Sequence, residues 1–77
     1  MSDTTARLMA LAARRFKVAE SGLTADSDFF QSLGIDSIQA LELLSELEMT
    51  FDVEIPDYEL QGVTTFRGLS ELIDARL

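Results

Sequence analysis

The fold of this chain is decided at residues 33–44, which read LGIDSIQALELL. A glycine turn at Gly34 leads into Asp36 and Ser37, and an apolar helix follows. Asp36 is a good N-cap, and Gln39 stands three residues further on, as in a capping box. Ser37 is therefore expected in the first turn of a helix, where the helix dipole and free backbone N–H groups favour a bound or attached anion. The serine either serves only to start the helix, or is a functional site, or does both.

The bulk composition limits what else the chain can be. Its 77 residues allow one domain, 1–77, and 47% of them are hydrophobic, which is ample for a packed core. The chain has no cysteine and no histidine, which excludes disulfides, thiolate metal sites, imidazole general bases and ordinary zinc sites. No apolar run approaches the length of a membrane span and no secretory signal is visible, so a cytoplasmic protein is the default expectation.

Hydrophobic periodicity predicts an all-α fold, a small bundle of three main helices plus one short helix. The main helices are expected over residues 4–17, over residues 37–50, and from Thr64 or Thr65 to about Arg76. The short helix is expected over residues 57–61, and the long connection 18–36 has room for one more helical turn around 28–32. Residues 51–56 alternate as a strand would, but an isolated strand has nothing to pair with, so an extended connection is predicted.

The faces of the helix at residues 37–50 follow from a rotation of 100° per residue. Ile38 and Met49 fall on one face, together with Glu42 and Ser45. The opposite face is the predicted core stripe, made of Ala40, Leu43, Leu44, Leu47 and Phe51. The two apolar side chains that point away from this stripe are covered either by a neighbouring loop or short helix, or by a partner.

The charges are unevenly distributed along the chain. The net charge is −8, and residues 18–66 contain no Lys or Arg. Such a surface repels nucleic acid and anionic membranes and attracts basic partner proteins, although acidic residues also simply keep small domains soluble. The pairs Asp26/Asp28 and Asp52/Glu54 offer too few ligands for a calcium loop, so no metal site is expected.

Ser37 is poorly equipped to be a catalyst. A nucleophilic serine needs a base, and the chain has no histidine. The only lysine, Lys17, ends another helix, and Asp36 is better placed to cap the helix that Ser37 begins. An exposed serine at a helix start is better suited to be modified by another protein, so the chain is not expected to be an enzyme.

The chain resembles an acyl carrier protein, both in its order of helices and in short motifs. The motifs are Phe29-Phe30, Leu33-Gly34-Ile35-Asp36-Ser37-Ile38, Glu42-Leu43 and Phe51-x-x-x-Ile55-Pro56. The resemblance is specific from Phe29 to about Phe66 and weaker over the first helix. It implies that Ser37, beside Asp36, receives 4′-phosphopantetheine from coenzyme A through a phosphodiester link. The thiol of that arm would hold acyl, aminoacyl or polyketide intermediates as thioesters.

The same resemblance implies the partners of a monomeric carrier. They would be a phosphopantetheinyl transferase and acyl-transferring or synthase enzymes with basic docking surfaces. The residues expected to contact them are Ile38, Leu41, Glu42, Ser45, Glu48 and Met49. The alternative is a helical interaction module that uses this acidic and apolar surface without any prosthetic group.

Some residues depart from the pattern of carriers in fatty acid synthesis. Ile38 replaces the usual leucine after the serine, and Gln39, Ser45, Met49 and Thr50 are neutral where those carriers have an acidic helix. The segment at residues 28–37 is more similar to the corresponding segment in carriers of polyketide and nonribosomal peptide assembly. A specialised free-standing carrier is therefore expected, although a domain excised from a larger synthase would have the same appearance.

Overall fold

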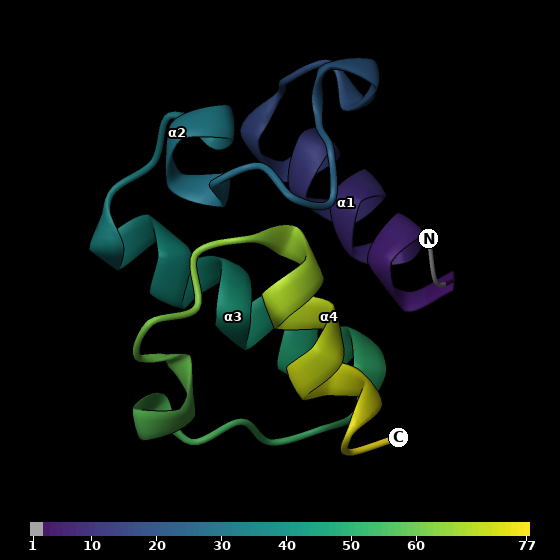
Figure 1. The fold of residues 1–77 in the computed structure, drawn as a ribbon, viewed down its shortest axis with the longest axis vertical. Helices are drawn as coiled ribbons and strands as arrows, with labels where there is room; N and C mark the ends of the chain where they lie inside the picture. The colour runs from purple at the N-terminus through teal and green to yellow at the C-terminus, as the bar shows by residue number, and fades with distance from the viewer. Residues whose placement is uncertain (1–2) are drawn as a thin grey trace.

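Four α-helices and two short 3-10 helices make up the structure, a computed structural model that describes residues 3–77. The helices in chain order are α1 (Asp3–Phe16), η1 (Glu20–Gly22), α2 (Phe29–Leu33), α3 (Ser37–Phe51), η2 (Asp57–Leu60) and α4 (Phe66–Asp74). Figure 1 shows α4 in front of α3, with α2 above the start of α3. The all-α bundle predicted from the sequence is confirmed, and residues 1–2 of the expected domain lie outside the described residues.

The helix boundaries agree closely with the hydrophobic pattern. The turn expected around residues 28–32 is α2, and the short helix expected over 57–61 is the 3-10 helix η2. α3 is one residue longer than predicted, because Phe51 closes the helix instead of opening the connection that follows. α4 begins after Thr65, whose side chain accepts a hydrogen bond from Gly68 N at 3.0 Å, and so the predicted threonine cap is present.

The core lies where the stripes of the three main helices meet, and α1 packs against α4. α3 contributes four of its five predicted core residues, while Ala40 is only partly buried. The largest side chains that are almost fully enclosed are Phe66, Leu8, Leu43, Leu47 and Ile73. A buried hydrogen-bonded pair also joins two of the helices, since Thr5 Oγ1 on α1 donates to Ser70 Oγ on α4 at 2.7 Å.

The end of α3 is fixed by Glu48 and Asp52. Asp52 has a left-handed φ of 56°, and the N–H groups of Asp52 and Val53 both donate to Glu48 O. The side chain of Glu48 extends this anchor, because its Oε2 accepts a hydrogen bond from Ile55 N at 2.9 Å. The connection that follows, residues 53–56, has no regular secondary structure and ends at Pro56 in an extended conformation, and within residues 3–77 it pairs with no strand.

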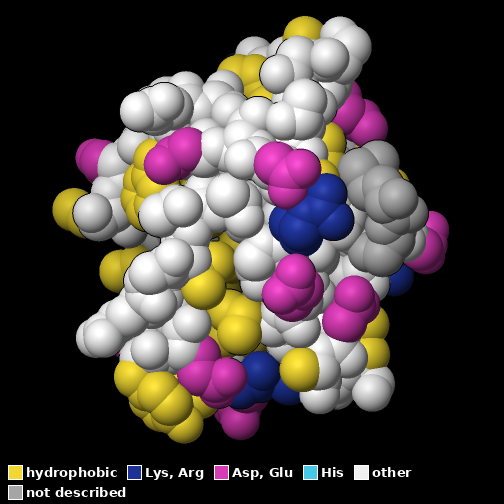
Figure 2. Space-filling view, in the orientation of Figure 1, with side chains coloured by type: hydrophobic (Ala, Val, Ile, Leu, Met, Phe, Trp, Pro, Cys, Tyr) yellow, Lys and Arg dark blue, Asp and Glu magenta, His cyan; other side chains and the backbone are white. Residues whose placement is uncertain are grey.

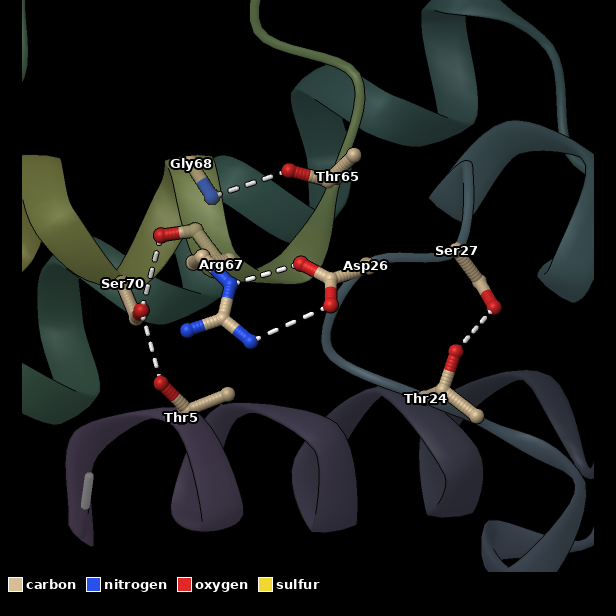
Figure 3. A network of polar contacts seen from close by, with 8 residues as sticks. All are labelled: Thr5, Thr24, Asp26, Ser27, Thr65, Arg67, Gly68 and Ser70. Carbon is tan, nitrogen blue, oxygen red and sulfur yellow. Dashed lines mark hydrogen bonds and ion pairs between the residues drawn. The ribbon is translucent and has the colours of Figure 1, made fainter. Parts of the chain in front are cut away.

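The segment that precedes α2 is tied to the start of α4 (Figure 3). Phe29 N donates to Thr64 O at 2.8 Å, and Arg67 N donates to Ala25 O at 2.8 Å. The guanidinium of Arg67 also pairs with both carboxylate oxygens of Asp26, at 2.6 and 3.2 Å. This hydrogen-bonded pairing lowers the pKa of Asp26 and raises the pKa of Arg67. The long connection is therefore ordered against α4, and it holds α2 in place beside α3.

Candidate functional site

The approach to Ser37 is shaped by the end of α2. Gly34 stops this helix with a left-handed φ of 67°, and the N–H groups of Gly34 and Ile35 both donate to Phe30 O. An L-residue is strained at such a φ, whereas glycine is not. The chain can thus reverse within two residues and deliver Asp36 to the start of α3.

The first turn of α3 has the predicted capping box. Asp36 Oδ1 accepts a hydrogen bond from Gln39 N at 2.9 Å, and Gln39 Oε1 accepts one from Asp36 N at 3.2 Å. Ser37 is the first residue of the helix, and its side chain is exposed. Because the cap uses the N–H of Gln39, the earlier N–H groups of this turn remain available to an anion near Ser37, at the positive end of the helix dipole.

The hydroxyl of Ser37 has no partner within the described part of the chain. It forms no hydrogen bond with any of residues 3–77. The nearest carboxylate in sequence, that of Asp36, is engaged in the helix cap and does not activate the serine. An exposed, unpaired hydroxyl beside a helix start is accessible to a modifying enzyme and lacks the base that a nucleophilic catalyst needs.

An apolar pocket of about 240 Å³ lies beside Ser37. Among the described residues that line it, Ser37 is the only polar one. The others come from α2, α3, η2, the η2–α4 connection and α4, and they are Phe29, Phe30, Ala40, Leu41, Leu43, Leu44, Leu60, Val63 and Leu69. This pocket was not among the predictions from the sequence. The pair Phe29-Phe30 was a signal, but the wall contributed by Leu60 and Val63 depends on tertiary packing.

The apolar side chains of α3 that lie outside the core stripe are exposed. Ile38, Leu41 and Met49 have exposed fractions of 68%, 50% and 79%. Of the two explanations for Ile38 and Met49, cover by a loop or short helix of the described residues is therefore wrong. Figure 2 shows a second gathering of hydrophobic side chains in its lower left, over η2 and the start of the connection to α4. Ser45 is exposed as well, between Leu41 and Met49 along the helix.

The acidic residues of α3 are less free than the sequence suggested. Arg15, near the end of α1, places Nη2 3.1 Å from Glu42 Oε2 and Nη1 3.3 Å from Glu46 Oε1. Glu48, expected to contact partners, is partly buried and accepts the hydrogen bond from Ile55 N. Sequence reasoning missed both arrangements, because neither Arg15 nor Ile55 is close enough in sequence to be paired with these residues by helical spacing.

Membrane spans and metal clusters are both absent from the described residues. No helix of residues 3–77 is both long and apolar enough to cross a membrane. Nor do His, Cys, Asp and Glu form a group of three or more within that range that could hold a metal ion.

Most of the chain matches the model of one known protein family. The model described as "Phosphopantetheine attachment site" matches residues 6–73, which include most of α1, the capped start of α3 and nearly all of α4.

Proposed function

The chain belongs to the phosphopantetheine attachment site family, and we propose that Ser37 is the residue that carries the arm. Membership makes the chain a carrier protein that holds 4′-phosphopantetheine covalently. Domains of this kind carry a prosthetic group, and they interact with transferases and synthases. When bound, the arm supplies a terminal thiol on which intermediates are held as thioesters.

The assignment to Ser37 is supported by its setting. The residue is exposed and opens a fifteen-residue helix, and its hydroxyl forms no hydrogen bond within residues 3–77. Attachment joins Ser37 Oγ to the phosphorus of coenzyme A that bears the pantetheine, and adenosine 3′,5′-bisphosphate leaves. The serine proton passes to the transferase, because no base among residues 3–77 is hydrogen-bonded to the hydroxyl. The phosphodiester formed at Ser37 would lie at the positive end of α3.

The cargo we propose is an acyl intermediate with a short apolar portion. The pocket beside Ser37 supports this, because nine of its ten lining residues are apolar. Its volume of about 240 Å³ is below the range of roughly 300–1,000 Å³ typical of pockets for drug-sized ligands. A short chain fits such a space, and a long one would extend beyond it.

We place the chain closer to carriers of polyketide and nonribosomal peptide assembly than to carriers of fatty acid synthesis. The support is the resemblance at residues 28–37 and the neutral residues Gln39, Ser45 and Met49 on α3. Residues 1–77 then form one carrier domain. The exposed Ile38, Leu41 and Met49 give its partners an apolar contact beside the modified serine.

The experiment is incubation of the chain with coenzyme A and a phosphopantetheinyl transferase, followed by intact mass spectrometry. We expect one added phosphopantetheine on the wild type. Ser37→Ala should gain no mass while keeping its helical circular dichroism. Ser21→Ala is the matched control, since it removes an exposed hydroxyl on η1, outside the α3 surface expected to contact partners, and it should load fully.

The outcomes separate the candidate functions. Normal loading of Ser37→Ala would place the arm on another residue. A folded wild type that gains no mass would favour the helical interaction module without a prosthetic group.

A further inference from the structure

All three glutamates of α3 already bind a group of their own chain. Glu42 and Glu46 share the guanidinium of Arg15, and Glu48 accepts the hydrogen bond from Ile55 N. α3 itself contains no lysine or arginine, and neither does any other part of residues 18–66. Within residues 3–77, the only cation that pairs with the acidic side of α3 is therefore supplied by α1, from a residue far away in the sequence.

The geometry of this contact suits exchange with another cation. Glu42 and Glu46 are one helical turn apart, and a single guanidinium reaches both carboxylates with its two terminal nitrogens. The side chains of Arg15, Glu42 and Glu46 are 33%, 54% and 34% exposed, so solvent reaches all three. Ion pairs as exposed as these are weak and are screened by salt, and an incoming charged group can displace one member.

We propose that Arg15 is an intramolecular competitor for the basic side chains of partner enzymes. It occupies Glu42 and Glu46, and a partner docks on α3 only by taking its place. This inference rests on the proposed function, because it assigns the partner as a basic enzyme that docks beside Ser37. Charge complementarity supports that choice, since α3 offers carboxylates and exposed apolar side chains but no cation.

Removal of Arg15 should therefore strengthen docking. If Arg15 only held the carboxylates of α3 in position, its removal would instead weaken binding of the partner. An exposed ion pair has a strength that corresponds to about a two- to fivefold change in affinity, and this is the gain expected when the competitor is lost.

The test measures binding of the unmodified chain to a phosphopantetheinyl transferase without coenzyme A, so that no group is transferred. Arg15→Gln is compared with Arg14→Gln, which changes the net charge equally. Arg14 is exposed and forms no ion pair with any of residues 3–77, so it is a matched control. Arg7 is less suitable, because its guanidinium lies 4.5 Å from the centre of the Phe51 ring.

The expected result has three parts. At about 50 mM salt, Arg15→Gln binds about two- to fivefold more tightly than Arg14→Gln. At about 500 mM salt the difference disappears, because both the pair and the docking contacts are screened. In a Glu42→Gln/Glu46→Gln background, Arg15→Gln has no further effect on affinity, because Arg15 has nothing left to occupy.

Three results would overturn the inference. Equal affinities of Arg15→Gln and Arg14→Gln would mean that only total charge matters. Weaker binding by a folded Arg15→Gln would make Arg15 a residue that positions the carboxylates or contacts the partner directly. Lack of binding by every variant would mean that the transferase does not dock on this surface.

A second variant covers the case in which Arg15→Gln does not fold. Arg15→Lys keeps the charge but cannot span both carboxylates with a planar fork. Its affinity for the transferase should lie between that of the wild type and that expected when Glu42 and Glu46 have no ion pair with residue 15. An affinity no higher than that of the wild type would contradict the inference.

Loading is scored separately by intact mass. A wild type that never gains phosphopantetheine would refute the proposed function. A wild type that loads, with equal binding by the two arginine variants, would refute only the role of Arg15 as a competitor.

Discussion

The carboxylate of Glu48 accepts a hydrogen bond from the backbone N–H of Ile55, so the helix that starts at Ser37 also holds the connection after its own end. Both residues are at least partly buried, and Ile55 is 4% exposed. This relationship changes the interpretation of an acidic residue that the sequence offered as a docking charge.

Replacement of Glu48 should therefore affect stability as well as docking. Glu48→Gln keeps an oxygen acceptor for Ile55 N and should leave the free energy of unfolding nearly unchanged. Glu48→Lys leaves that N–H without its partner and should cost about 1–3 kcal/mol. Urea unfolding of both variants checks this, and equal stabilities would show that the hydrogen bond is dispensable.

Gly34 is the residue on which the turn into α3 depends. Gly34→Ala should destabilise the chain by about 1 kcal/mol, because an L-residue is strained in the left-handed conformation. A Cβ there would meet no atom within 4 Å, so backbone strain alone is measured. Gly22 is the control, since it is equally open but has no positive φ. Gly22→Ala should be neutral or stabilising by about 0.4–1 kcal/mol, and equal losses at both positions would contradict this explanation.

Ile38 and Met49 should matter to partners rather than to folding. With exposed fractions of 68% and 79%, each should lose less than about 0.5 kcal/mol of stability when changed to alanine. Ile38→Ala should slow loading of Ser37, and Met49→Ala should slow it less, because Met49 lies about three helical turns away.

Leu47→Ala, at a fully buried position of the same helix, is the comparison for both variants. It should cost about 2–5 kcal/mol. A similar loss of stability in Ile38→Ala, with loading unchanged, would show that Ile38 belongs to the core.

The ion pair between Asp26 and Arg67 should make part of the stability depend on pH. Pairing lowers the pKa of Asp26 in the folded chain, so its contribution is complete above the unfolded pKa of about 4. The contribution is lost as the pH falls from that value through the folded pKa. The difference in thermal midpoint between the wild type and Asp26→Asn should be constant near neutral pH and shrink below about pH 4. A difference that persists unchanged at lower pH would point to the hydrogen bonds and not to the charge.

The pocket beside Ser37 should be sensitive to added volume. Ala40 lines it and is only partly buried, so Ala40→Leu places a larger side chain in the space proposed for the cargo. Attachment of a short acyl chain should raise the thermal midpoint of the wild type, because the chain enters the pocket and is removed from water. This gain should be smaller in Ala40→Leu and intact in Thr50→Leu, whose position on the same helix is exposed and outside the pocket. Equal gains in all three proteins would place the acyl chain outside the pocket.

The sequence predicted best what depends on neighbours along the chain. The capping box of Asp36 and Gln39, the threonine cap of α4 and the stripe of Leu43, Leu47 and Phe51 all follow from local spacing. Phe51 was at once the last member of that stripe and the first residue of an alternating run. In the structure Phe51 packs into the core and is the last residue of α3, not the first residue of the connection.

What the sequence did not predict depends on which helices lie side by side. Arg15 is 27 residues from Glu42, and their contact exists only because α1 packs with its last turn beside α3. The pocket likewise needs Phe30, Leu41 and Val63 from three separate segments. Each of these residues has an ordinary place in its own pattern, so no local signal marks it as part of a shared wall.

Part of the pocket wall comes from a stretch of the chain that does not contain Ser37, and this separates two properties of the proposed carrier that evolution could alter. Leu60 and Val63 lie after α3, outside the turn that presents Ser37 and outside the Ile38–Met49 face. In the proposed function, substitutions there would change which cargo is sheltered, while the transferase would still recognise the same serine. A carrier with this layout would be able to change what it transports and remain a substrate of the same loading enzyme.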